Sequence, residues 1–255
     1  MAPSPDTLLA AGAALDASLA CVRTFVGPGR STREIDRFAA SVLRRFRLEP
    51  AAPALADDRG RSFPGVCSVG ANDAFANAPP SDRVVRVGDL VTLDLPARRG
   101  EVVLDAAVPL VVGRDPDRAA LAEAAGRVLG AMIGVLGPGI TPERLWRAGR
   151  EESARGGVRL VRRPFGHGLG PGLHEPPALR PDSQSPIGVG CVLALEPVVT
   201  RGAGRIVSGE DGWSLRTADG ADACSAEATV AVTRGGAIVV CGRPENPCRR
   251  GDSGS

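Results

Sequence analysis

The chain of 255 residues has no lysine, no tyrosine and only two histidines, His167 and His174. Arginine therefore supplies all 31 basic side chains, and the formal net charge is only +2. Charge alone gives no reason to expect a polyanionic partner. The basic residues are scattered apart from segments 44–47 and 159–164, which are more typical of solvated faces than of a nucleic-acid stripe. We therefore predict no specific nucleic-acid partner.

Cysteine motifs and targeting segments are also missing. The six cysteines form no C-x-x-C pair, which argues against a zinc ribbon or a thioredoxin-type motif and favours a reducing compartment. The N-terminal segment has no basic start and is interrupted by Asp6 and Asp16, unlike a signal peptide. No apolar run approaches the roughly 20 residues needed to span a bilayer. We expect a cytoplasmic protein without a membrane partner.

A repeated helical pattern organises the chain. Residues 5–26 read as a helix that ends at a Gly-Pro-Gly stop, and Ser31 with Glu34 then has the spacing of a capping box. A helix beginning near Asp117 ends at a second Gly-Pro-Gly, and Thr141 with Pro142 starts the next helix. The two copies lie about 110 residues apart in the sequence. Either the chain is internally duplicated, or two common helix stops coincide.

Apolar runs predict strands after each helix pair. Residues 89–96 and 101–113 read as a hairpin, and residues 190–200, 227–233 and 236–241 read as buried strands. Hydrophobic residues make up 43% of the chain, which is ordinary for a globular protein. The pattern predicts an α/β fold with one domain over residues 1–241. Residues 242–255 are rich in Pro, Gly and charge and predict a disordered tail.

Two aspartates of the predicted hairpin carry the first chemical signal. If the hairpin is symmetric about the bond between residues 99 and 100, Asp94 directly faces Asp105, with Cβ atoms about 5 Å apart. Two carboxylates at that distance need either a shared proton or a cation between them. The alternative is a register shifted by one residue, which turns one aspartate to solvent.

Two glutamates stand in equally apolar surroundings. Glu196 and Glu227 lie in runs that should be buried, and a buried unpaired carboxylate costs several kcal/mol unless it is neutralised or coordinated. Four such acids with a histidine segment between them indicate a shared metal centre. Hard oxygen ligands and one imidazole suit Mn(II), Fe(II), Co(II) or Zn(II). Four carboxylates balance two divalent ions.

Both histidines lie in one segment rich in glycine and proline, "RPFGHGLGPGLHEPP". This segment, the "GDLVTLDL" strand with an aspartate eleven residues later, the "LEPVV" run, Glu227 before Ala-Thr-Val, and "DGWSLRT" together resemble the type I methionine aminopeptidases of the pita-bread metallopeptidases. The resemblance extends from about residue 31 to residue 240. It implies a pseudo-symmetric α/β fold with a curved antiparallel sheet covered by helices.

The resemblance also implies a dinuclear metal site and a role for each of its residues. Asp94 would bind one ion alone, Asp105 and Glu227 would bridge both, and His167 and Glu196 would complete the other. A water or hydroxide between the ions would be the nucleophile. Glu196 would also act as general base. His174 would steady the scissile carbonyl, its alternative being a purely structural histidine.

Three positions depart from the family pattern. Asn77 stands where the family carries a third histidine that contacts the substrate, and asparagine cannot titrate. Ala228 replaces a usual histidine, and Ser68 replaces the cysteine of the methionine pocket. Phe63 and Trp213 are candidate walls of that pocket, or ordinary core residues. These departures put efficient aminopeptidase activity in question.

Three functions are open at this point. The first is removal of N-terminal methionine from nascent chains or peptides by a monomeric enzyme with two Mn, Fe, Co or Zn ions. The second is a specialised peptidase with a different substrate. Asn77 and the "APP" that follows it favour this alternative. The third is a peptide-binding relative without catalysis, which the complete ligand set disfavours.

Overall fold

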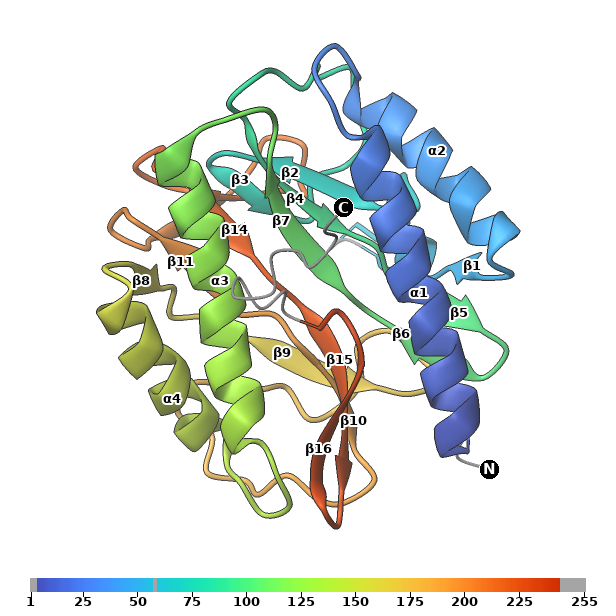
Figure 1. Ribbon diagram of the computed structural model, residues 1–255, viewed down its shortest axis with the longest axis vertical. Coiled ribbons are helices and arrows are strands. Elements are labelled where there is room, and N and C mark those ends of the chain that lie inside the picture. Colours follow the sequence, from blue (N-terminus) through green and yellow to red (C-terminus); the bar gives the residue numbers. More distant parts are fainter. Residues whose placement is uncertain (1–3, 57–58, 244–255) are drawn as a thin grey trace, which may run out of the picture.

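The computed structural model describes residues 4–56 and 59–243 (Figure 1). The predicted disordered tail therefore lies almost wholly outside the described residues. The helices are α1 (Pro5–Phe25), α2 (Thr32–Arg45), η1 (Ala52–Ala54), α3 (Pro116–Val135) and α4 (Pro142–Arg155). The strands of the N-terminal half are β1 (Glu49–Pro50), β2 (Ser68–Ala71), β3 (Ala74–Ala76), β4 (Leu90–Asp94), β5 (Ala97–Arg99), β6 (Val102–Leu104) and β7 (Ala107–Val111). The C-terminal strands are β8 (Arg159–Leu160), β9 (Gly166–Leu169), β10 (Val192–Leu195), β11 (Val198–Thr200), β12 (Ile206–Ser208), β13 (Leu215–Thr217), β14 (Ala223–Ser225), β15 (Ala228–Thr233) and β16 (Gly236–Cys241).

All four predicted α-helices are confirmed, and each begins at a side-chain cap. Ser4, Asp115 and Thr141 accept a backbone N–H from the first turn of α1, α3 and α4. Ser31 and Glu34 form the predicted reciprocal capping box at α2. The two long helices span 21 and 20 residues, and each shorter one spans 14. The two halves of the chain therefore carry helix pairs of matching length.

The two helix pairs cover separate hydrophobic clusters on one side of the strands. Figure 1 shows α1 beside α2 and α3 beside α4, with β7, β15 and β16 between the pairs. Leu15 and Ile35 from the first pair pack with Leu93 and Leu104. Residues of the second pair, such as Leu129 and Leu145, pack with Leu193, Leu195 and Val230. The strands reach both clusters and so connect the halves.

Helix α1 departs from one expectation. It is long and apolar enough to cross a membrane by length and composition, whereas the sequence reading found no such run. In the structure one face of α1 is buried against the first hydrophobic cluster, with Leu15 and Val22 fully covered. Gly12 lies so close to the carbonyl of Val240 in β16 that a Cβ atom would collide with it. A helix packed in a protein core can have the same length and apolar composition as a membrane span, so these two properties are weak evidence for a membrane.

Within residues 4–56 and 59–243 the strands form four antiparallel sheets. The orders are β1-β5-β6, β16-β15-β10-β9, β14-β11-β8 and β12-β13-β3-β2-β4-β7. Four pairs of consecutive strands in the described residues are divided between two sheets: β4 continues as β5, β6 as β7, β10 as β11, and β14 as β15. Because a strand that changes sheet must bend, these breaks curve the surface around one region.

The predicted hairpin register is wrong by two residues. Asp94 pairs with Ala107, and Arg99 pairs with Val102, so the turn is centred on Gly100 and Glu101. Gly100 has a φ of 56°, the left-handed conformation that a two-residue hairpin turn needs at this position. A shift of two residues preserves which face each side chain occupies, whereas a shift of one inverts it. Asp94 and Asp105 therefore do not face each other directly but still share one face.

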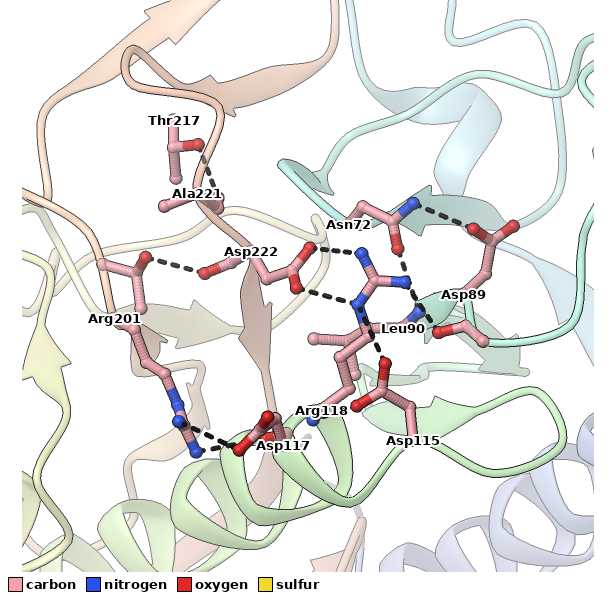
Figure 2. Close-up of polar contacts among 12 residues, drawn as sticks. Asn72, Asp89, Leu90, Asp115, Asp117, Arg118, Arg201, Thr217, Ala221 and Asp222 are labelled. Atoms are coloured by element: carbon pink, nitrogen blue, oxygen red, sulfur yellow. Dashed lines mark hydrogen bonds and ion pairs between the residues drawn. The ribbon is translucent and has the colours of Figure 1, made fainter.

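A polar network around Arg118, at the start of α3, ties the two halves together (Figure 2). The guanidinium donates to both carboxylate oxygens of Asp222 at 2.8 and 3.0 Å and to the Gly88 carbonyl at 2.7 Å. Next to it, Asn72 donates to Asp89 and accepts from the backbone of Leu90. Asp222 immediately precedes β14, and Leu90 begins β4. The network thus joins the strand that ends at Asp94 to the strand that leads to Glu227.

Candidate metal centre

The four acids predicted from the sequence stand at the four strand breaks. Asp94 is the last residue of β4, Asp105 follows β6, Glu196 follows β10, and Glu227 precedes β15. Backbone bonds hold three of these breaks: the amides of Leu95, Glu196 and Glu227 donate to the carbonyls of Ala106, Phe165 and Ala107. The curvature of the sheets therefore directs all four acids to one region.

Three of the predicted ligands form a compact group. Asp105, His167 and Glu227 each offer a ligand atom, and these atoms all lie within 4.8 Å of one another. The His167 Nε2 atom lies 3.9 Å from a carboxylate oxygen of Asp105. The other ring nitrogen of His167, Nδ1, lies 3.1 Å from the carbonyl oxygen of Gly168. That contact favours a proton on Nδ1 and leaves Nε2 as the free donor atom for a cation.

Electrostatic coupling places Asp94 and Glu196 beside this group. Burial, and then the charge of Glu196, raises the pKa of Asp94 to about 7. Burial, followed by the charges of Asp94 and Glu196, holds the pKa of Asp105 well above its usual range. Burial, and then the charge of Asp105, also raises the pKa of Glu227 well above its usual range. Asp94, Asp105 and Glu227 thus resist simultaneous ionisation without a compensating positive charge.

The donor atoms fit a site for divalent ions. The Oδ1 atoms of Asp94 and Asp105 are buried and have no hydrogen-bond partner in the described part of the chain. Native structures seldom leave buried polar atoms unpaired, and an ion is one of the ordinary explanations. A cation would satisfy these oxygens and remove the mutual repulsion of the carboxylates. Oxygen donors with a single imidazole belong to the harder divalent metals.

Thr229 is a member of this region that the sequence reading missed. Its hydroxyl accepts the Asp105 amide at 2.9 Å and donates to the Asp105 carbonyl at 2.8 Å. It thus satisfies both backbone groups of Asp105 at the point where β6 ends. Thr229 stands two residues after Glu227, and alternation along a strand places such residues on one face. This two-residue spacing from Glu227 was the sequence signal that could have identified Thr229.

His174 lies next to His167 but in different surroundings. The two ring centroids are 4.3 Å apart at an interplanar angle of 71°. His174 is exposed, yet nearby protein atoms still desolvate its ring, and this lowers its pKa, as does the adjacent His167. A lowered pKa keeps the imidazole neutral near pH 7, so that it can donate one hydrogen bond to a ligand.

Ser68 and Asn77, two of the three departures, lie at the open end of the β2–β3 hairpin, where Ser68 begins β2 and the chain bends at Asn77 after β3. The buried Ser68 hydroxyl accepts the backbone amide of Ala78 at 2.9 Å, and Val69 donates to the Ala78 carbonyl at 3.2 Å. Asn77 has a φ of 50°, a left-handed conformation that asparagine adopts readily. Ser68 also pairs with Asp94 across β2 and β4. The serine therefore fixes the turn that presents Asn77.

The candidate pocket walls are in contact with each other. The rings of Phe63 and Trp213 meet edge to face, with centroids 5.2 Å apart. The carboxylate of Asp211 accepts the amide of Trp213 at 2.8 Å and fixes the loop that carries it. Phe63 is buried and Trp213 is half-buried. Ala228, the third departure, is fully buried in the second hydrophobic cluster.

Known proteins resemble the chain over most of its length. Residues 6–234 match the profile of metallopeptidase family M24. The methionine aminopeptidase of Treponema pallidum is 32% identical over 213 residues, which cover 81% of each chain. Methionine aminopeptidase 2 of Bacillus subtilis is 28% identical over 220 residues, which cover 84% of this chain and 86% of the relative. The crystal structure of a methionine aminopeptidase from Thermotoga maritima has a TM-score of 0.85 at 27% identity and covers 96% of this chain and 99% of that one.

These similarities confirm two expectations, the pita-bread fold and the family resemblance. They agree with the geometry of the site, where Asp105 and Glu227 lie with His167 and are coupled to the charges of Asp94 and Glu196. The chain therefore belongs to metallopeptidase family M24, in its methionine aminopeptidase branch, and is a metallo-aminopeptidase.

Proposed function

We propose that the protein hydrolyses the peptide bond after an N-terminal methionine of nascent chains or peptides, with two divalent ions of Mn, Fe, Co or Zn. The observation that supports this proposal is the compact group of Asp105, His167 and Glu227, which is coupled to the charges of Asp94 and Glu196. Two buried carboxylate oxygens of Asp94 and Asp105 have no partner among the described residues. A peptide-binding relative without catalysis has no need of such a set, whose charges repel one another.

Each residue of the site has a separate role in the proposed hydrolysis. Asp94 would hold one ion, Asp105 and Glu227 would be shared by both ions, and His167 with Glu196 would complete the second. When bound, the ions polarise the scissile carbonyl and lower the pKa of the attacking water. Glu196 takes the proton from that water and passes it to the leaving amine. His174, neutral and beside His167, donates a hydrogen bond to the developing oxyanion.

Substrate binding is assigned to the residues near the turn at Asn77. Phe63 and Trp213 supply an apolar wall, and Ser68 holds the turn that presents Asn77. The Asn77 amide can bind the substrate near the scissile nitrogen but cannot carry a proton between groups. We therefore expect slower turnover than a histidine at this position would allow. A cytoplasmic location and a monomeric state complete the proposal.

Asn77 also favours a second candidate function within the same family. A peptidase with a non-methionine substrate would not need the missing histidine to handle the same proton. The experiment is a panel of X-Ala-Ser tripeptides, with X varied, incubated with the purified protein and Mn(II) or Co(II). Release of X fastest for methionine supports the proposal. Turnover without a methionine preference favours the specialised peptidase, and a folded, metal-loaded protein that cleaves none of the panel contradicts both.

A further inference from the structure

The segment that carries His174, residues 168–175, closes on itself and is called the histidine loop below. Gly168 and Glu175 exchange backbone hydrogen bonds at 2.8 and 2.9 Å. The Glu175 carboxylate also accepts the Gly172 amide at 2.8 Å, and a Cβ atom at Gly172 would lie only 2.7 Å from this carboxylate. These bonds all lie inside the loop, so they fix its shape but not its position on the first half of the chain.

Contacts with the first half of the chain position the histidine loop. Arg98, in the middle of β5, donates from its guanidinium to the carbonyl of Pro171 at 2.6 Å. Pro171 lies in the middle of the loop. Leu169 and Leu173 are buried and belong to a small apolar cluster that includes Val103 of β6. The loop therefore has one polar and one apolar contact with the hairpin of β5 and β6.

The polar contact is the one that sets the orientation of the loop. Hydrophobic contacts are non-directional, whereas a hydrogen bond requires a short distance and a favourable angle. A charged donor such as the Arg98 guanidinium forms the stronger class of hydrogen bond. Arg98 follows Asp94 by four residues, where the chain passes from β4 into β5. The bond to Pro171 thus relates the loop to the strand that carries Asp94.

The position of the loop decides where the His174 ring lies. His174 follows Pro171 by three residues, and its ring centroid is 4.3 Å from that of His167. A hydrogen-bond donor stabilises a developing oxyanion only when it is held within about 3 Å of that oxygen. Even a small displacement of the histidine loop would weaken such a bond, and misplacement by about 1 Å can slow a reaction strongly.

We propose that Arg98 is a positioning residue of the reaction. Its bond to the Pro171 carbonyl holds the histidine loop so that the His174 ring reaches the scissile carbonyl. This inference rests on the proposed function. Arg98 acts through His174 and has no contact with the reacting atoms.

A double-mutant cycle tests this role with Met-Ala-Ser as substrate and the parent, Arg98→Ala, His174→Ala and the double variant as enzymes. Loss of an oxyanion donor lowers kcat by about 10²–10³, so its misplacement in Arg98→Ala should lower kcat by roughly tenfold, with KM nearly unchanged. In the His174→Ala background, Arg98→Ala should have no further effect. Arg98→Lys keeps a donor and should recover most of the loss. An equal loss in both backgrounds overturns the proposal.

Arg99→Ala is the matched control from the same strand. The Arg99 guanidinium donates to the carbonyls of Phe46 at 2.6 Å, Ala10 at 3.3 Å and Arg47 at 3.4 Å. All three acceptors lie in the first half of the chain, so this variant loses comparable bonds without releasing the histidine loop. Its kcat should equal that of the parent, and a loss as large as that of Arg98→Ala contradicts the proposed role.

Hydrogen exchange at the Gly172 and Glu175 amides measures the loop without catalysis. Both amides are bonded inside the loop, so they exchange when it opens. Exchange should be roughly three- to tenfold faster in Arg98→Ala than in the parent, and unchanged in Arg99→Ala. If the parent cleaves no peptide, the proposed function is contradicted, and exchange alone decides whether Arg98 holds the loop. Equal exchange in the parent and Arg98→Ala overturns that role.

Discussion

At the scale of single residues, Asn77 distinguishes this chain from its family pattern. Its φ of 50° lies in the left-handed region, where histidine, like asparagine, is also found more often than most residues. The Asn77→His change therefore adds a titratable ring without straining the turn. We expect kcat for Met-Ala-Ser to rise by about tenfold or more, since a positioned acid–base group contributes 10²–10⁴-fold in enzymes.

Asn77→Ala is the control for that change. It removes the amide and adds no group that carries a proton, so turnover should stay the same or fall. Steady-state kinetics at saturating metal measure all three proteins. An Asn77→His protein no faster than the parent would show that Asn77 is not the reason for any slow turnover.

The raised pKa of Asp94 makes the metal-free protein sensitive to pH. Its ordinary value is 3.8, and the folded value is about 7. Over this interval the folded state binds more protons than the unfolded state, so the free energy of unfolding falls as pH rises from about 4 to 7. Thermal unfolding of metal-free protein should therefore give a lower Tm at pH 7 than at pH 5.

Two controls accompany this measurement. Mn(II) should raise the Tm more at pH 7 than at pH 5, because the carboxylates must lose their protons to bind it. Asp94→Asn should show a smaller fall in the metal-free Tm between these pH values. A metal-free Tm that rises over the same interval is incompatible with the shared burial of these acids.

At the scale of elements, the sequence predicted the apolar strands within residues 89–113, 190–200 and 227–241. It predicted neither the remaining strands, such as β2, β3 and β9, nor the points where the strands break. Asp94, Asp105, Glu196 and Glu227 stood out because each interrupts an apolar run. The breaks themselves depend on pairing between distant segments, as in the bond from the Glu227 amide to the Ala107 carbonyl. Such contacts leave no local periodicity. The hairpin error had a local cause, since Gly100 marks the turn position that the assumed symmetry ignored.

The Arg118 network tests how the elements around the site are held. Arg118 and Asp222 have side chains only 25% and 29% exposed, and two hydrogen bonds join them. Arg118→Ala should lower the free energy of unfolding by about 1–3 kcal/mol, since it leaves Asp222 without its partner. Urea unfolding of the metal-free protein measures the change.

Arg201 provides a matched control in the same region (Figure 2). Its side chain is 49% exposed and lies 3.5 Å from the exposed Asp117. Arg201→Ala should change the stability by less than about 1 kcal/mol, as is usual for surface ion pairs. Equal losses in the two variants would show that the Arg118 contacts add nothing beyond a surface charge.

At the scale of the whole molecule, the candidate site depends on both halves of the chain. Asp94 and Asp105 come from the first half, and His167, Glu196 and Glu227 come from the second. The sequence motifs predicted which residues belong to the candidate site, because each acid and the histidine segment could be recognised on its own. The spacing of Thr229 from Glu227 indicated a shared face, but its hydrogen bonds to the Asp105 backbone could not be predicted, since they join segments far apart in the sequence.

The central claim is that this assembled site is a metal centre that releases N-terminal methionine. The direct measurement is methionine release from Met-Ala-Ser by metal-free protein titrated with Mn(II), with the bound metal determined in the same samples. The account predicts that release is absent without metal, rises as the site fills and disappears on chelation. A folded protein that binds the ion fully and releases no methionine, with Mn(II), Fe(II), Co(II) or Zn(II), would contradict it.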